Sequence, residues 1–321
     1  MNQSRVRVLI QVTLAVVFWG ASFIATKISL REVAPITVVW LRFAMGVVIL
    51  GAAVWMRRDF KWVPVRELGY FALLGFIGIT FHQWLQSNAL ETSQASTTAW
   101  VVATSPVFIA LLSWLFLRER LSLVPVLGIA LAAAGVLLVV TKGDLGSIEL
   151  GKFGAPGDIL ILISAVNWAV FTVLSRRGLR LHSAALMMFY VMVLGWLLSS
   201  ALFIAGPGLA DIGRLTLDGW LAVGFLGVFC SGLSYIFWYD ALKLIPASQV
   251  GVFLYFEPLV TVVVAAAILQ ESLVPAEALG GAIILFGVWL VNRREDRAAT
   301  NPGATVGSPA APSLSGKPRE M

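Results

Sequence analysis

Charged residues are scarce in this sequence. Only 12% of its 321 residues are charged and 59% are hydrophobic, with a mean hydropathy of +0.89. Soluble domains carry about 25% charged residues. So few charges do not cover the water-facing surface of a chain this long. A soluble fold is therefore excluded, and we expect much of the surface to contact the lipid bilayer.

Cysteine and histidine are nearly absent too. Cys230 is the single cysteine, and His82 and His182 are the two histidines. One cysteine forms no intrachain disulfide, and so few ligands argue against a metal cluster. The net charge is +6, but the basic residues lie in short clusters between apolar runs rather than in one patch. We therefore expect no metal and no nucleic-acid partner.

Long apolar runs are what the sequence does contain. A membrane-spanning helix needs about 20 mostly apolar residues. The first run is too long for the apolar region of a cleaved signal peptide, which has about 7–15 residues. Ten spans are predicted, at 8–30, 36–56, 68–90, 95–117, 122–141, 157–176, 183–205, 219–243, 247–269 and 275–293.

Lysine and arginine predict the orientation, because loops rich in them stay in the cytoplasm. With the amino terminus inside, the inner segments hold seventeen of these residues and the outer loops hold four. Both termini are therefore expected to be cytoplasmic. Residues 298–321 are rich in Pro, Gly, Ser and Ala, which predicts a disordered cytoplasmic tail.

The two halves of the chain repeat one another. Gly75-Phe76 and Gly78 recur as Gly224-Phe225 and Gly227, 149 residues later. Further matches recur 152 residues later, so a three-residue shift separates the two registers. These are Ala89-Leu90 with Ala241-Leu242, Ala95-Ser96 with Ala247-Ser248, Pro106 with Pro258, Glu119 with Glu271, Leu121 with Leu273, Gly128 with Gly280, and Gly135 with Gly287.

Each repeat contains five predicted spans, an odd number, so the second copy must enter the membrane from the opposite side. The predicted fold is an all-α polytopic membrane protein of ten transmembrane helices in two inverted five-helix repeats. The repeats are 1–150 (helices 1–5) and 151–297 (helices 6–10). Inverted repeats are a recurring design of transporters, whose site lies between the halves near the midplane.

Several short motifs resemble those of one family, the EamA-type carriers of the drug/metabolite transporter superfamily. The resemblance covers about residues 8–295. It implies a ten-helix fold with the amino terminus inside, a place in the inner membrane, and the export of metabolites such as amino acids. The motifs are Phe18-Trp19-Gly20 followed by Phe23 and Lys27, Leu41-Arg42-Phe43, Ser105-Pro106 leading to Arg118-Glu119, and Glu257-Pro258 leading to Gln270-Glu271.

Three ionisable residues inside predicted spans are candidates for binding and coupling, because each costs about 2.5–3.5 kcal/mol in the membrane. Lys27 and Arg42 lie in the outer third and are predicted to hold a substrate carboxylate or phosphate. Alternatively, Lys27 extends to the interface and Arg42 caps carbonyls or pairs with Glu32. Glu257, just before Pro258, is predicted to couple transport to protons; alternatively it stabilises a helix broken by the proline or pairs with a basic residue.

Polar and aromatic side chains complete the predicted binding site. His82 and Gln86 lie one turn apart and can hydrogen-bond a polar ligand, although a lone histidine also serves as an interhelical contact. Lipid contact is the alternative for the aromatic residues. The other candidates are Trp19, Phe23, Asn167, Trp168, Tyr235 and Tyr239. Glu119 and Glu271 end spans on opposite sides and are expected to serve in turns or caps.

The sequence therefore predicts a secondary transporter that exports amino acids or similar small polar metabolites by alternating access. No cofactor is expected: residues 146–152 match part of a phosphate loop, but Phe153 replaces its Ser or Thr. The alternatives are a non-transporting scaffold or sensor and, with no recognisable catalytic group, a membrane-embedded enzyme. Gly128, Gly135, Gly280 and Gly287 allow close helix packing, within the chain or in a homo-oligomer.

Overall fold

The computed structural model describes residues 3–117, 123–144, 154–244, 250–251, 253–272 and 274–299, with the side chains of 3–5, 116–117 and 292–299 left out. Three predictions fall outside these residues. They concern Glu119 within 118–122, the phosphate-loop-like stretch within 145–153, and the tail from residue 300 onward. Throughout the described residues the chain forms helices and turns, without a strand.

The described part of the first half forms helices joined by short turns. α1 spans Gln3–Ser29 and α2 spans Pro35–Met56. A third stretch consists of α3 (Val65–Gly75), the π-helix η1 (Phe76–Phe81) and α4 (His82–Thr92). A fourth consists of α5 (Ala95–Val102) and α6 (Ser105–Leu117), and α7 (Leu123–Val140) is the last.

The described part of the second half is helical as well. α9 spans Pro156–Leu181, α10 spans Ala184–Ala205, and the short α11 spans Gly208–Ile212. α12 (Leu217–Phe225), the π-helix η2 (Leu226–Leu233) and α13 (Ser234–Leu244) follow one another. The next stretch is η3 (Phe253–Phe256), α15 (Glu257–Val264) and the π-helix η4 (Ala265–Leu269), and α16 spans Pro275–Ala299.

These helices confirm an all-helical membrane fold. Eight helical stretches of the described residues are long and apolar enough to cross a membrane, and they match the first eight predicted spans. Two shorter apolar helices, Phe253–Leu269 and Pro275–Val291, take the places of the ninth and tenth. The break expected at Pro258 is present as a 3₁₀ turn that ends where α15 begins, because proline lacks the N–H that would continue the helix.

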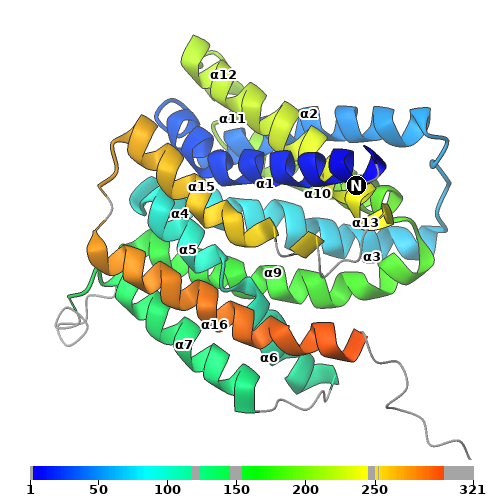
Figure 1. Cartoon of the computed structure of the whole chain (residues 1–321). Coiled ribbons are helices and arrows are strands. Elements are labelled where there is room, and N and C mark those ends of the chain that lie inside the picture. Colours follow the sequence, from blue (N-terminus) through cyan, green and yellow to red (C-terminus); the bar gives the residue numbers. More distant parts are fainter. Residues whose placement is uncertain are drawn as a thin grey trace, which may run out of the picture.

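Glycines bring α7 and α16 into close contact along one edge of the bundle, where Figure 1 shows the two helices side by side. A Cβ on Gly128 would lie 2.5 Å from the carbonyl oxygen of Gly287, and a Cβ on Gly135 would lie 2.7 Å from that of Gly280. Only glycine fits at such distances. The glycines singled out in the sequence therefore pack within the chain.

The remaining helices pack mainly across the two halves. α1 packs against α12, η2, α13 and α15, whereas α9 packs against η1, α4, α5 and α6. Likewise α2 packs against η2, and α10 packs against α3 and η1. The core is thus built from contacts between distant parts of the sequence rather than from neighbouring helices alone.

We call the two ends of the bundle the Lys27 end and the Arg57 end. The Lys27 end holds the turns at 30–34, 93–94, 206–216 and 270–272, and the Arg57 end holds the turns at 57–64 and 182–183. At the Arg57 end, Arg57 makes an ion pair with Asp240, and Lys243 lies 3.3 Å from Asp59. Ion pairs therefore tie α2 and its following turn to α13.

Candidate functional site

Arg42 is the centre of a buried polar cluster in the middle of the bundle. Its side chain projects from α2 and is only 6% exposed. Its Nε donates a hydrogen bond to Ser231 Oγ at 3.1 Å, and its Nη1 donates one to Gln83 Oε1 at 3.1 Å. No described carboxylate makes an ion pair with Arg42, and it does not contact Glu32. Its positive charge is therefore held by neutral partners alone.

Aromatic side chains of α1 and α13 line one side of this cluster. Trp19 donates its indole N–H to the carbonyl oxygen of Cys230 at 3.1 Å, next to Ser231 in the chain. The Trp19 ring lies 5.7 Å from Tyr235 and 5.2 Å from Trp238, and Tyr235 lies 6.2 Å from Tyr239. Trp19 and Tyr235 thus lie beside the residues that bind Arg42, whereas Tyr239 lies farther along α13, with Leu50, Val54 and Arg57, toward the Arg57 end of the bundle.

His82 belongs to a second cluster, one residue along α4 from Gln83. Its Nδ1 lies 3.0 Å from Ser164 Oγ, and its ring lies 4.9 Å from that of Trp168. Asn167 donates from Nδ2 to the carbonyl oxygen of Ile77 at 2.8 Å, within the π-helix η1. His82, Asn167 and Trp168 therefore lie together, as partners of one another or of nearby backbone.

Glu257 lies where α15 meets α1. A Cβ on Gly20 would be 2.8 Å from the Glu257 carbonyl oxygen, and Thr261 donates to the carbonyl oxygens of both residues. The Glu257 side chain is half-buried, and none of the described residues donates a hydrogen bond to its carboxylate. It is therefore a carboxylate inside the bundle that has no protein partner in the described part of the chain.

Lys27 lies apart from these groups, at the end of the bundle that bears its name. Its Nζ donates to the carbonyl oxygen of Ser93 at 2.7 Å and lies 3.3 Å from Glu271 Oε1. Phe23, one turn before it, is buried among apolar residues such as Ile24 and Leu90. Neither side chain contacts Arg42, so of the motif residues on α1, Trp19 lies in the inner cluster and Phe23 and Lys27 lie at the Lys27 end.

Glu271 has the most hydrogen bonds at the Lys27 end. Its carboxylate accepts from the N–H groups of Ala95 and Ser96 at 2.9 and 3.1 Å and from Ser96 Oγ at 2.9 Å. Partial burial raises the pKa of Glu271, but these hydrogen bonds and the charge of Lys27 lower it by more, so the pKa lies below the usual value. The expected capping role is present, although the helix that it caps is α5 of the other half.

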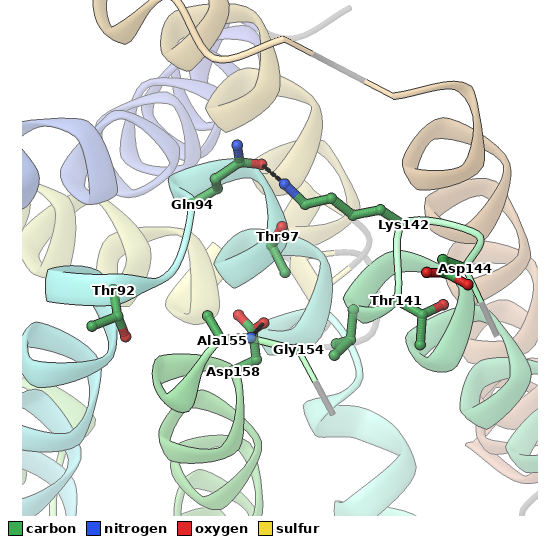
Figure 2. A pocket seen from close by; sticks show the side chains of 10 residues that line it. Thr92, Gln94, Thr97, Thr141, Lys142, Asp144, Gly154, Ala155 and Asp158 are labelled. Atoms are coloured by element: carbon green, nitrogen blue, oxygen red, sulfur yellow. Dashed lines mark hydrogen bonds between the residues drawn. The ribbon is translucent and has the colours of Figure 1, made fainter. Parts of the chain in front are cut away.

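A pocket of about 300 Å³ opens beside this contact. Figure 2 shows Lys142 reaching from the end of α7 to Gln94, with the two groups joined by a hydrogen bond of 3.0 Å. Asp158 lies at the base and accepts hydrogen bonds from Ser93 Oγ and the Ala155 N–H. These polar groups satisfy one another, so the described lining of the pocket shows no unpaired charge that would indicate a ligand.

The structure thus collects most predicted site residues into two adjoining clusters and leaves others apart. Gln86 lies one turn beyond His82 and is half-exposed. Sequence reasoning missed the two partners of Arg42. Gln83 was a neighbour of predicted residues, but Ser231 carried no signal, because a serine in an apolar run is ordinary until the helix facing it is known.

Helices of this length and apolarity, with ion pairs at their ends and polar clusters inside, define a multi-pass membrane protein. The model of the EamA-like transporter family matches residues 6–141 and again residues 155–293. The chain belongs to the EamA-like transporter family. The resemblance found in the sequence is therefore confirmed.

Similar proteins agree with this assignment. A protein of Archaeoglobus fulgidus named as an uncharacterized transporter is 30% identical over 291 residues, 89% of this chain and 98% of the relative. The uncharacterized inner membrane transporter YedA of Escherichia coli K12 is 29% identical over 281 residues, 86% and 87% of the two chains. A crystal structure with 22% identity matches in fold, with a TM-score of 0.61 over 91% of this chain and 98% of its own.

Proposed function

We propose that this membrane transporter is a secondary carrier that exports amino acids or similar small polar metabolites by alternating access. Its moving parts are two inverted repeats, residues 1–150 and 151–297, followed by a cytoplasmic tail, 298–321. Both termini lie in the cytoplasm and the protein resides in the inner membrane. The Lys27 end of the bundle then faces outward and the Arg57 end faces inward.

Contacts between the repeats support the inverted arrangement. The repeat register pairs Gly128 with Gly280 and Gly135 with Gly287. In the structure Gly128 meets Gly287 and Gly135 meets Gly280, so the partners are exchanged, as a two-fold axis between α7 and α16 requires. Two further pairs of helices follow the same exchange. α1 packs on α13, and α9, the counterpart of α1, packs on α4, the counterpart of α13. A fold symmetric in this way has two forms of similar energy, one open to each side.

The observation that carries the transport proposal is the buried, unpaired charge of Arg42. A charge inside a membrane protein normally has a partner or lines a pathway, and the described partners of Arg42 are neutral. These partners come from both proposed repeats, Gln83 from the first and Ser231 from the second. An anionic group of the substrate would complete the site between the halves, held by two parallel hydrogen bonds from the guanidinium.

Glu257 is proposed as the coupling residue. It is a half-buried carboxylate without a described partner, and carboxylates inside membrane proteins commonly serve in proton transfer. Trp19, Tyr235 and Tyr239 would contact the apolar part of the substrate, while His82, Gln86, Asn167 and Trp168 form the adjoining wall. Lys27 and Phe23 act farther out, at the Lys27 end.

Flux in liposomes tests this function. Metabolites that accumulate outside cells only when they contain the protein identify the substrate, whose flux is then measured under an imposed pH gradient. We expect Arg42→Ala to lower flux by about 100-fold or more, the effect of removing one partner of a buried charge pair. Val191→Ala is the matched control, because Val191 takes the place of Arg42 in the second repeat. Normal flux in Arg42→Ala would overturn the proposal.

The scaffold or sensor hypothesis makes a different prediction, because such a protein needs no polar pathway. Single cysteines at positions 42, 86 and 257 would be labelled from one side or the other in a carrier. Protection of all three from both sides of the membrane would favour a scaffold and contradict alternating access.

A further inference from the structure

Glu271 joins three parts of the chain that a carrier must separate to open outward. Its carboxylate lies in the turn between α15 and α16 and binds the first N–H groups of α5. It also lies 3.3 Å from the ammonium group of Lys27 on α1, which in turn binds the Ser93 carbonyl before α5. The side chain of Glu271 is only 9% exposed. One carboxylate thus holds both proposed repeats together at the Lys27 end.

An apolar layer lies directly beneath this contact. It consists of Phe23 and Ile24 of α1, Leu90 of α4, Ala95 and Ala99 of α5, and Ala265 of η4, all buried. The same elements that Glu271 and Lys27 tie together therefore also exclude water below them. The hydrogen bonds of Glu271 and the packing of the apolar layer are independent observations. Both indicate that the bundle is closed at the Lys27 end.

We propose that Glu271, Lys27 and the first turn of α5 form a latch that closes the outer side of the carrier, above a seal made by the apolar layer. This inference rests on the proposed transport function and describes its regulation. Opening outward requires the carboxylate to leave two backbone N–H groups, the Ser96 hydroxyl and Lys27. Charge-assisted bonds of this kind are about twice as strong as neutral ones, so the latch sets how often the outer side opens.

The latch assigns Lys27 a different task from Arg42. The Lys27 ammonium already has two partners in the closed form, a carboxylate and a carbonyl, whereas Arg42 has only neutral ones. A substrate leaving outward would pass Lys27 after the latch has opened. Lys27 is therefore a gate residue in this proposal.

Labelling of one cysteine beneath the latch tests the proposal without a known substrate. Ala99→Cys places a thiol of similar size in the seal, and Cys230→Ser removes the native thiol. Intact cells are treated with a membrane-impermeant methanethiosulfonate reagent. We expect slow labelling with the latch intact and labelling about 10-fold faster or more in Glu271→Gln, since tenfold corresponds to one charge-assisted contact. Ser96→Ala, which removes one donor, should give an increase of about 2–3-fold.

Glu32→Gln is the matched control. Glu32 also accepts a backbone N–H and a hydroxyl, both from Thr216, at the same end of the bundle, but it does not cover the seal. An unchanged rate in Glu271→Gln, or an equal increase in Glu32→Gln, would overturn the latch. Melting temperatures close to the parent protein verify that each variant is folded. Liposome flux is measured separately, so a folded chain that opens but carries nothing refutes the transport proposal instead.

Discussion

The π-helices η1 and η2 occupy corresponding places in the chain, and they differ in length. Gly75 and Gly78 match Gly224 and Gly227 in the 149-residue register. After these segments the register is 152, so the second half contains three more residues. η1 has six residues and η2 has eight. A π-helix winds more residues into each turn than an α-helix, and η2 is two residues longer than η1, close to the register shift of three.

Contacts on either side locate the extra residues. His82 Nδ1 lies 3.0 Å from Ser164 Oγ on α9. The counterpart of His82 in the second half is Ser234, 152 residues later, and the counterpart of Ser164 in the first half is Ala15, 149 residues earlier. Ser234 Oγ donates to the carbonyl oxygen of Ala15 on α1 at 3.4 Å. The two contacts correspond, so the extra residues lie between Gly227 and Ser234.

That interval contains the groups that face Arg42 and Trp19. Ser231 accepts a hydrogen bond from Arg42, and the Cys230 carbonyl accepts one from Trp19. In η1, Thr80 donates instead to the carbonyl oxygen of Gly195, a contact between helices. The two segments therefore pack alike but differ in chemistry. In the proposed carrier, two similar halves would thus give a one-sided binding site through an insertion in only one of them.

The largest expected effect tests the shared packing role. Gly46 on α2 and Gly195 on α10 are 149 residues apart, and a Cβ on either would lie under 3 Å from the facing segment, at Ser231 or at Ile79. Gly46→Val and Gly195→Val should each destabilise the protein by about 3 kcal/mol or more, because the facing backbone cannot yield. Thermal unfolding in detergent measures this. Gly69→Val, where a Cβ meets nothing within 4 Å, is the control.

A loss of stability in only one of the two variants, Gly46→Val or Gly195→Val, would contradict this prediction. It would mean that η1 and η2 do not pack equivalently, and the correspondence would then be one of sequence only. Equal damage would support a common scaffold on which the polar groups were varied.

The next effect concerns the charge of Arg42. Gln83→Glu would supply a carboxylate where the side-chain oxygen now accepts from Arg42 at 3.1 Å. This internal ion pair would compete with an anionic substrate, so we expect flux to fall by about 100-fold while the melting temperature stays the same or rises. Gln83→Leu keeps the charge of Arg42 available and should retain much more flux. Equal flux in the two variants would show that Arg42 does not bind the substrate.

Much of the fold was predictable because the bilayer imposes one simple rule on span length. Apolar windows predicted the helical spans, and the glycine matches that predicted the repeat lie at the close contacts of α7 with α16. Pro258 predicted a break that is present. The π-helices were not predicted, since a wider turn leaves no mark in hydropathy. The three-residue shift in register falls at η2, the longest of them.

The candidate site was predictable only in part, for a physical reason. An arginine in an apolar run is conspicuous by itself, and so is a glutamate before proline. Ser231 is not, because its role depends on α2 lying opposite η2. The contact of Lys27 with Glu271 joins residues 244 positions apart and depends on how the helix ends meet. Composition shows which residues are costly to bury, whereas their partners follow from packing.

The smallest expected effect separates orientation of the arginine from packing. Ser231→Ala removes the acceptor of Arg42 Nε, and Thr80→Val removes the hydroxyl through which η1 binds the Gly195 carbonyl of α10. Each should lower the free energy of unfolding by about 1 kcal/mol, the value of one buried hydrogen bond, so stability alone does not distinguish them. The KM of transport should: we expect an increase of about 5–10-fold in Ser231→Ala, because the guanidinium loses a group that fixes its direction, and no change in Thr80→Val. An equal increase in KM in both variants would contradict this prediction. It would mean that both halves contribute alike to the binding site and that the insertion at η2 has no role in binding.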